Sequence, residues 1–158
     1  MQQNILITGV SSGIGHGLVN HYLSKTDYHV YGVSRRDVAI RSEHFHFARL
    51  DLAKLDEIEK TISDLLKGIS SLELIVLNAG ILPPFADLKD TAMADIKDTM
   101  QVNVWANKVL LDYLLAAGPE IKQVIGISSG ASQSGHRGWN AYAISKAALN
   151  MLLALYAA

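Results

Sequence analysis

The chain has 158 residues, a formal net charge of −1 and a hydrophobic content of 49%. This length suits a single domain with a substantial core, and the balanced charge excludes both a disordered chain and the basic surface of a nucleic-acid-binding protein. The absence of cysteine excludes disulfides, zinc thiolates and thiol catalysis.

The first four residues lack the basic start and the long apolar core of a signal peptide. No uninterrupted apolar run approaches the roughly 18 residues of a membrane span. We therefore expect a cytoplasmic protein that binds neither a membrane nor nucleic acid.

Apolar periodicity predicts strands and helices that alternate along the chain. A strand at 5–8 is followed by a helix from 14 to about 25, strands at 29–34 and 44–50, and a helix at 52–66. A buried strand at 72–77, a long helix at 91–117, a fifth strand at 121–128 and a helix at 141–158 complete the order. This alternation predicts an α/β fold with a doubly wound parallel sheet, Rossmann-like and formed by one domain.

A glycine-rich turn joins the first strand to the first helix. It reads Thr8-Gly9-Val10-Ser11-Ser12-Gly13-Ile14-Gly15. Gly9 permits a tight turn, Gly13 leaves room for a phosphate, and Gly15 allows the helix and strand to pack closely. With the N–H groups and dipole of the following helix, the turn predicts a pyrophosphate-binding loop.

Other polar residues also fall where predicted strands end: Ser34-Arg35, Asp51, Asn78 and Ser129. Ligands of doubly wound folds bind beyond these carboxyl ends, at the point where the strand order reverses. On the last helix, Tyr142 and Lys146 are four residues apart and share a face, with Asn140 as the expected N-cap. An ammonium beside a phenol stabilises the phenolate, which suits the pair to general acid–base chemistry.

Together these motifs resemble those of the short-chain dehydrogenases/reductases over nearly the whole chain. The resemblance covers the glycine loop, the pair Asp51-Leu52 after the third strand, and Leu77-Asn78-Ala79-Gly80, where leucine replaces the family's first asparagine. It also covers the family's catalytic set, matched by Asn103, Ser129, Tyr142 and Lys146, with Ser129 thirteen positions before Tyr142.

The resemblance implies a nicotinamide-dependent oxidoreductase that acts on a small carbonyl or alcohol substrate. Tyr142 would exchange the proton with the substrate oxygen, Ser129 would bind that oxygen, and Lys146 would assist Tyr142 and hold the nicotinamide ribose. Asn103 would anchor a water of the proton relay, and Asn78, Ala79 and Gly80 would shape the cofactor cleft. Asp51 and Leu52 would contact the adenine.

Because Ser34 stands where an NAD-specific protein usually carries an acidic residue, and Arg35 and Arg36 follow, we expect NADP(H) rather than NAD(H). Ser11 and Ser12 are included in the predicted cofactor site. A homodimer or homotetramer is also expected from the resemblance.

Several alternatives remain open. A dinucleotide-binding sensor or scaffold would need no Tyr142, and sugar-nucleotide epimerases usually space their glycines differently. Ser128 rivals Ser129, although strand alternation points it to the other face. His136, Arg137 and Trp139 either touch substrate or cover the catalytic loop. His44 and His46 share a strand face, but without a third ligand we expect no metal site.

The end of the chain leads to one more expectation. Relatives of this kind continue with further strands and a substrate-covering segment, so the chain is expected to be a truncated or incompletely traced member. Residues 124–127 would then form an open sheet edge, and the last helix would expose apolar residues.

Overall fold

The computed structural model describes residues 3–158, so that Met1 and Gln2, used above in judging the N-terminus, lie outside the described residues. Five strands form a parallel sheet in the order β3-β2-β1-β5-β7. They are β1 (Gln3–Thr8), β2 (Tyr28–Ser34), β3 (Phe45–Arg49), β5 (Leu74–Leu77) and β7 (Val124–Gly126). The doubly wound parallel sheet expected from the sequence is confirmed.

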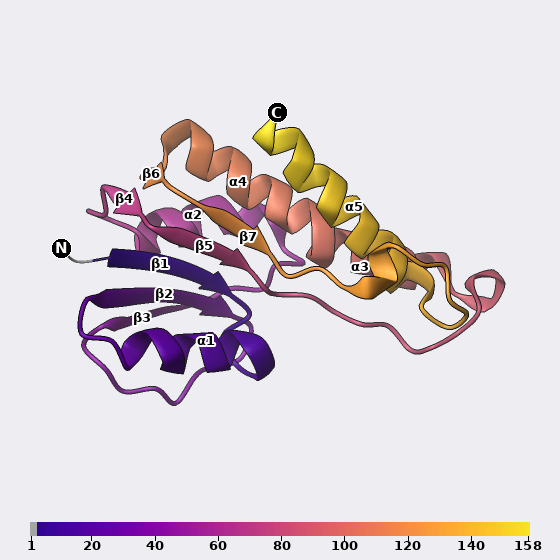
Figure 1. Ribbon diagram of the computed structural model, residues 1–158, viewed down its shortest axis with the longest axis horizontal. Coiled ribbons are helices and arrows are strands. Elements are labelled where there is room, and N and C mark those ends of the chain that lie inside the picture. Colours follow the sequence, from indigo (N-terminus) through magenta and orange to yellow (C-terminus); the bar gives the residue numbers. More distant parts are fainter. Residues whose placement is uncertain (1–2) are drawn as a thin grey trace.

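Helices cover both faces of this sheet (Figure 1). Helix α1 (Gly13–Leu23) lies on one face, while α2 (Leu55–Leu65) and α4 (Ala106–Ala117) lie on the other. Helices α3 (Met93–Met100) and α5 (Asn140–Ala157) pack against each other, and short 3₁₀ turns at Leu88–Asp90 and Gly130–Ser132 lie in the loops. No helix among residues 3–158 combines the length and the hydropathy that a membrane crossing requires.

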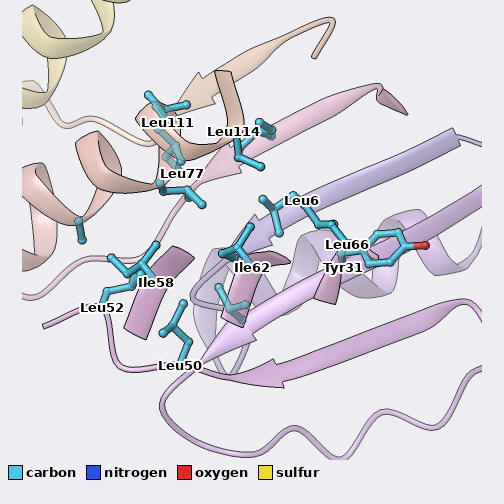
Figure 2. Close-up of a cluster of buried hydrophobic side chains, with 14 of the residues drawn as sticks. Leu6, Tyr31, Leu50, Leu52, Ile58, Ile62, Leu66, Leu77, Leu111 and Leu114 are labelled. Atoms are coloured by element: carbon cyan, nitrogen blue, oxygen red, sulfur yellow. The ribbon is translucent and has the colours of Figure 1, made fainter. Parts of the chain in front are cut away.

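Strand alternation divides the core into two clusters. In β1, Leu6 points to the cluster beneath α2 and α4, and Ile5 and Ile7 point to the cluster beneath α1. Figure 2 shows the larger cluster, in which Ile58 and Ile62 of α2 meet leucines from the sheet and from α4. Apolar burial on both faces explains why the central strands read as continuous apolar runs.

Two expected strands are each interrupted. The expected strand at 72–77 is split at Glu73 into β4 (Ser71–Leu72) and β5, and the strand at 121–128 is split into β6 (Glu120–Ile121) and β7. The short strands β4 and β6 pair in a separate two-stranded sheet. At the interruption, Lys122 Nζ and Glu73 Oε2 form an exposed ion pair of 2.7 Å. A charged residue therefore occupies each break, Glu73 between β4 and β5 and Lys122 between β6 and β7.

The long helix expected at 91–117 contains a π-helical turn, Gln101–Trp105, between α3 and α4. The π turn includes the fully buried Asn103, and Asn107 Nδ2 donates a hydrogen bond to the Asn103 carbonyl over 2.9 Å. Insertions of this kind often mark functional positions in helices.

The start of α5 also differs from the expectation. Asn140 is the first helical residue and not the N-cap, which is Trp139. Its φ of +24° lies in the left-handed region, and its side-chain Nδ2 donates to the Pro84 carbonyl over 2.9 Å. Tyr142 nevertheless lies in the first turn, as predicted. At the other side of the sheet, β7 forms the edge, and Ile125 is 40% exposed.

Candidate functional site

A cavity of about 370 Å³ opens beyond the carboxyl ends of β1, β2 and β5. Its lining comes from the glycine loop, the ends of three strands, the π turn and the start of α5. The residues are Gly9, Ser11, Ser12, Ile14, Val33, Ser34, Arg35, Arg36, Leu50, Asp51, Leu52, Asn78, Ala79, Gly80, Ile81, Leu82, Val102, Ile127, Tyr142 and Lys146.

The glycine loop has the close contacts that its spacing suggested. Gly9 has φ +78° and lies so near Ala79 that a Cβ would come within 2.9 Å of its Cα. A Cβ on Gly15 would meet the Gly9 carbonyl oxygen at 2.3 Å. Gly13 has φ +60° and faces open space, so its backbone is accessible to a ligand. These contacts fit the close approach of a dinucleotide pyrophosphate to the start of α1.

Two polar side chains fix this loop to β5. The Thr8 Oγ1 accepts hydrogen bonds from the backbone N–H groups of Asn78 and Ala79, both over 3.0 Å. In return, Asn78 Nδ2 donates to the carbonyls of Thr8 and Gly9 over 2.9 and 3.1 Å. Thr8 is fully buried and Asn78 lines the cavity. Asn78, Ala79 and Gly80 all line the cavity, and their role toward a cofactor stays a prediction.

The outer part of the cavity is basic. Arg36 Nη2 donates to Ser12 Oγ over 3.0 Å and lies 3.4 Å from Ser11 Oγ. Ser34 Oγ donates to the Arg36 carbonyl over 2.6 Å, which fixes the turn after β2. Asp51 Oδ1 accepts from the Ala53 N–H over 3.0 Å. A guanidinium and two serine hydroxyls therefore converge at one end of the cavity, a donor set that suits a phosphate.

Tyr142 and Lys146 lie together at the opposite end. The Lys146 Nζ is 5.6 Å from the centre of the Tyr142 ring and donates to the Ile127 carbonyl over 2.6 Å. Only 4% of Lys146 is exposed, and this burial lowers the pKa of its ammonium. The Cβ of a residue replacing Gly80 would lie 3.2 Å from Asn103 Oδ1, which is a tight contact, and 3.6 Å from Lys146 Nζ, which is an ordinary one.

Asn103 lies next to the cavity but does not line it. Its Nδ2 donates to the Ile81 carbonyl over 3.0 Å and to Ser145 Oγ over 2.9 Å, and its Oδ1 accepts from the Ile81 N–H over 2.8 Å. Both amide protons are therefore used within the protein, and the side chain connects the loop after β5 to helix α5.

Thr8, Gly13, Gly15 and Ser129 also lie outside the lining. The first three support the loop. Ser129 follows β7 by three residues, and its Oγ accepts from the Ala131 N–H over 3.2 Å at the start of a 3₁₀ turn. Ser128 Oγ is buried without a hydrogen-bond partner among residues 3–158.

Several cavity residues were missed in the sequence. Ile81, Leu82, Val102 and Ile127 line the inner end with Tyr142. These residues are apolar, and the same residue types fill the core, so their composition did not mark them as cavity residues. The available signal was position: Ile81 and Leu82 follow the Asn78-Ala79-Gly80 motif, and Ile127 follows the end of β7.

His44, which precedes β3, and His46, within β3, have a neighbour that we did not expect. His29 of β2 approaches both, with Nε2 2.9 Å from His44 Nδ1 and Nδ1 3.2 Å from His46 Nε2. Because His29 uses a different nitrogen toward each partner, the rings form a chain. Within residues 3–158, histidine and acidic side chains form no group of three arranged to hold a metal ion.

Comparison with known proteins places this geometry in a family. The family model for short chain dehydrogenases matches residues 3–158. A Saccharomyces cerevisiae benzil reductase that forms (S)-benzoin is 33% identical over 95% of this chain and 63% of its own length. A short-chain dehydrogenase/reductase structure from the same yeast has a TM-score of 0.87 at 27% identity, covering 98% of this chain and 64% of that one.

A further solved structure, ElxO with NADP bound, gives a TM-score of 0.83 at 25% identity over 96% of this chain and 65% of its own. The chain thus spans a little under two thirds of the length of these relatives. The family model covers all the described residues, and the glycine loop, Asn78-Ala79-Gly80 and the Tyr142/Lys146 pair surround one cavity. The protein belongs to the short-chain dehydrogenase family.

Proposed function

We propose that this protein is an oxidoreductase that transfers a hydride between a nicotinamide cofactor and a carbonyl/alcohol substrate. The observation that carries the proposal is that Tyr142 and Lys146 line the same cavity as the glycine loop. A protein that only binds a dinucleotide needs the loop, but it has no use for a phenol and an ammonium at the far end of the cavity.

The chemistry divides between cofactor and protein. Bound nicotinamide supplies the hydride in reduction and accepts it in oxidation. In reduction, Tyr142 gives its phenolic proton to the carbonyl oxygen as the carbonyl carbon gains the hydride, and an alcohol results. In oxidation, Tyr142 takes the hydroxyl proton. The Lys146 ammonium, 5.6 Å from the phenol ring centre, stabilises the negative charge that Tyr142 gains on losing its proton.

Ser129 and Asn103 take the remaining roles. The Ser129 Oγ accepts a hydrogen bond from Ala131, so its hydroxyl proton is available to stabilise a developing oxyanion on the substrate. Asn103 positions the Ile81 backbone and helix α5 through Ser145. With both amide protons used in this way, we assign Asn103 a positioning role and not direct contact with the reacting atoms.

Tyr142→Phe tests the proposal. Because it removes the transferable proton and little volume, we expect turnover to fall at least about 100-fold while NADPH affinity changes less than about threefold. Turnover is followed by nicotinamide absorbance over a panel of ketones, aldehydes and alcohols, and affinity by calorimetry. Ser134→Ala, at a half-buried position outside the cavity lining, is the control. A Tyr142→Phe loss below about tenfold contradicts the assignment.

We further propose that the cofactor is NADP(H). Arg36, Ser11 and Ser12 provide charge-assisted donors for a 2′-phosphate, and Ser34 occupies the place of a repelling carboxylate. ElxO, a similar structure, holds NADP. Arg36→Gln is expected to weaken NADPH binding about tenfold or more and to leave NADH binding within about twofold. Equal binding of both cofactors by the parent protein contradicts the preference.

The substrate is proposed to be a small carbonyl compound or its alcohol. A homodimer or homotetramer is proposed because large apolar side chains are exposed on and beside α4 and α5: Trp105, Leu115, Ile144, Met151 and Leu155. Light scattering after size-exclusion chromatography measures the assembly directly, and a monomer at micromolar concentration contradicts this assignment.

A further inference from the structure

Three aromatic rings form a row that starts at Tyr142. The Trp139 ring centre is 5.7 Å from that of Tyr142, and the Phe85 ring centre is 5.0 Å from that of Trp139. Phe85 and Trp139 meet edge to face at 83°, and Trp139 is tilted by 39° to Tyr142. The edge-to-face arrangement is one that aromatic pairs favour, and both pairs have ring centres within the usual contact range. The aromatic row, comprising Phe85, Trp139 and Tyr142, therefore extends outward from the proposed proton donor.

The aromatic row is held by contacts between two loops, residues 81–92 and 127–139. Ala86 and Trp139 form an isolated parallel β-bridge, and Asn140 Nδ2 donates to the Pro84 carbonyl over 2.9 Å. Arg137 Nε donates to Asp87 Oδ1 over 3.0 Å. The bridge joins backbone atoms, and the Asn140 side chain donates to a backbone carbonyl, so neither contact uses the side chain at position 139. In Figure 1 these two loops run side by side beyond the sheet.

The exposed part of the aromatic row is apolar. Phe85 is 63% exposed, Leu82 at the cavity lining is 51% exposed, and Trp139 is partly buried. The fixed charges of the two loops are paired with one another, Arg137 with Asp87 and Lys89 with Asp90. A phosphate or carboxylate on a substrate thus meets no free counter-charge from these loops, whereas a flat apolar group meets exposed rings.

We infer that the aromatic row is a substrate subsite and that it selects carbonyl compounds carrying an aryl ring. The inference rests on the proposed oxidoreductase function. An aryl ring packed on Trp139 places an attached carbonyl beside Tyr142, whose ring is the next in the row. Aromatic pairs gain stability beyond the area that they bury, so the subsite favours an aryl group over a saturated ring of similar size.

Binding of unreactive substrate analogues tests the subsite separately from turnover. Benzamide and cyclohexanecarboxamide both present a carbonyl on a six-membered ring, and neither is reduced. Their affinities for the NADP⁺-loaded full chain are measured by ligand-observed NMR titration. We expect benzamide to bind about three- to tenfold more tightly. Equal affinities, or no binding of either analogue, would overturn the inference.

Variants of Trp139 test whether the aromatic row causes the preference for benzamide. Trp139→Leu keeps an apolar side chain but removes the ring, so we expect the ratio of the two affinities to fall close to one. Trp139→Phe keeps an aromatic ring, so we expect it to retain most of the preference for benzamide. Trp105→Leu, at the other tryptophan, which is 45% exposed on the π turn, is the matched control and should leave the ratio unchanged. A ratio that persists in Trp139→Leu refutes the subsite.

The proposed function has its own readout, the reduction of any carbonyl by NADPH. If the parent protein reduces carbonyls but shows no preference between the two analogues, the subsite is wrong and the function stands. If the preference is found and no carbonyl is reduced, the oxidoreductase proposal fails while the aryl-binding site remains.

Discussion

Replacing Gly15 by alanine is the sharpest test of the glycine loop, because helix α1 provides a matched control. A Cβ at position 15 would lie 2.3 Å from the Gly9 carbonyl oxygen and 2.5 Å from Asn78 Nδ2. The first of these atoms belongs to the backbone and has little freedom to move. A Cβ on Gly17, two residues later in the same helix, would meet nothing within 4 Å.

The expected energies follow from this difference. Alanine is better than glycine in a helix by up to about 1 kcal/mol, and this gain applies to both variants. Forcing a methyl group into a packed site costs about 1–3 kcal/mol, and this cost applies only to Gly15→Ala. Gly17→Ala should therefore be as stable as the parent or more stable, and Gly15→Ala should unfold about 1–3 kcal/mol more easily than Gly17→Ala.

Urea unfolding followed by circular dichroism gives the free energy of unfolding of each variant. NADPH titration should also show weaker binding to Gly15→Ala alone, since the displaced Gly9 belongs to the cavity lining. Equal stability of the two variants, within about 0.5 kcal/mol, would refute the close packing of helix and loop described here.

Three further predictions concern buried and interhelical contacts. Thr8→Val should lower the free energy of unfolding by about 1–3 kcal/mol, because the partly buried Ala79 N–H loses its acceptor and the Asn78 N–H keeps only its bond to the Val76 carbonyl. Thr8→Ser, which keeps the hydroxyl, should restore most of this loss in urea unfolding. Asn103→Leu should slow turnover and destabilise the fold, whereas Asn103→Asp, which keeps the oxygen that accepts from Ile81, should be milder by both assays. Burial and the hydrogen bond to Asp112 raise the pKa of Tyr156 to about 12, above its ordinary value of 10.0, so this contribution to stability is present below pH 10 and is lost as the pH rises toward 12. Thermal unfolding at a series of pH values should show this alkaline loss in the parent and not in Tyr156→Phe, and the same slope in both proteins would contradict it.

Much of the fold could be predicted because the central strands are buried on both faces. Their continuous apolar runs located β1, β2 and β5 closely, and the glycine loop fixed the junction with α1. The interruption at Glu73 escaped notice because one charged residue between apolar neighbours does not change the apolar period. Glu73 forms an exposed ion pair with Lys122, which lies at the corresponding break between β6 and β7. The sequence-based prediction had no means of pairing the two.

The parts of the site that could be predicted are those whose chemistry requires particular residue types at fixed spacing. Glycines at fixed spacing, and a tyrosine and lysine one helical turn apart, are conspicuous, and the structure brings them to one cavity. The roles of these residues stay predictions. The apolar lining at Ile81 and Leu82 depends on how separate segments pack, which local patterns do not encode. The same holds for the approach of His29 to His44 and His46.

The buried amide of Asn103 is one of the contacts that join the two ends of the cavity. The cofactor end is held by Thr8 and Asn78, whose hydrogen bonds remain within β1, β5 and the glycine loop. The end that carries the phenol belongs to α5. Asn103 connects α5 to the loop after β5, since it bonds Ile81 on one side and Ser145 on the other, and the Asn140 bond to Pro84 joins the same two segments. Ser145 Oγ in turn donates to the Tyr142 carbonyl over 2.8 Å. A hydride transfer requires that the two reactants be held at a defined distance and orientation, and the residues that bind them hold them there. The π turn that places Asn103 inside the fold therefore sets the geometry between the cofactor loop and Tyr142, although Asn103 itself lines no part of the cavity.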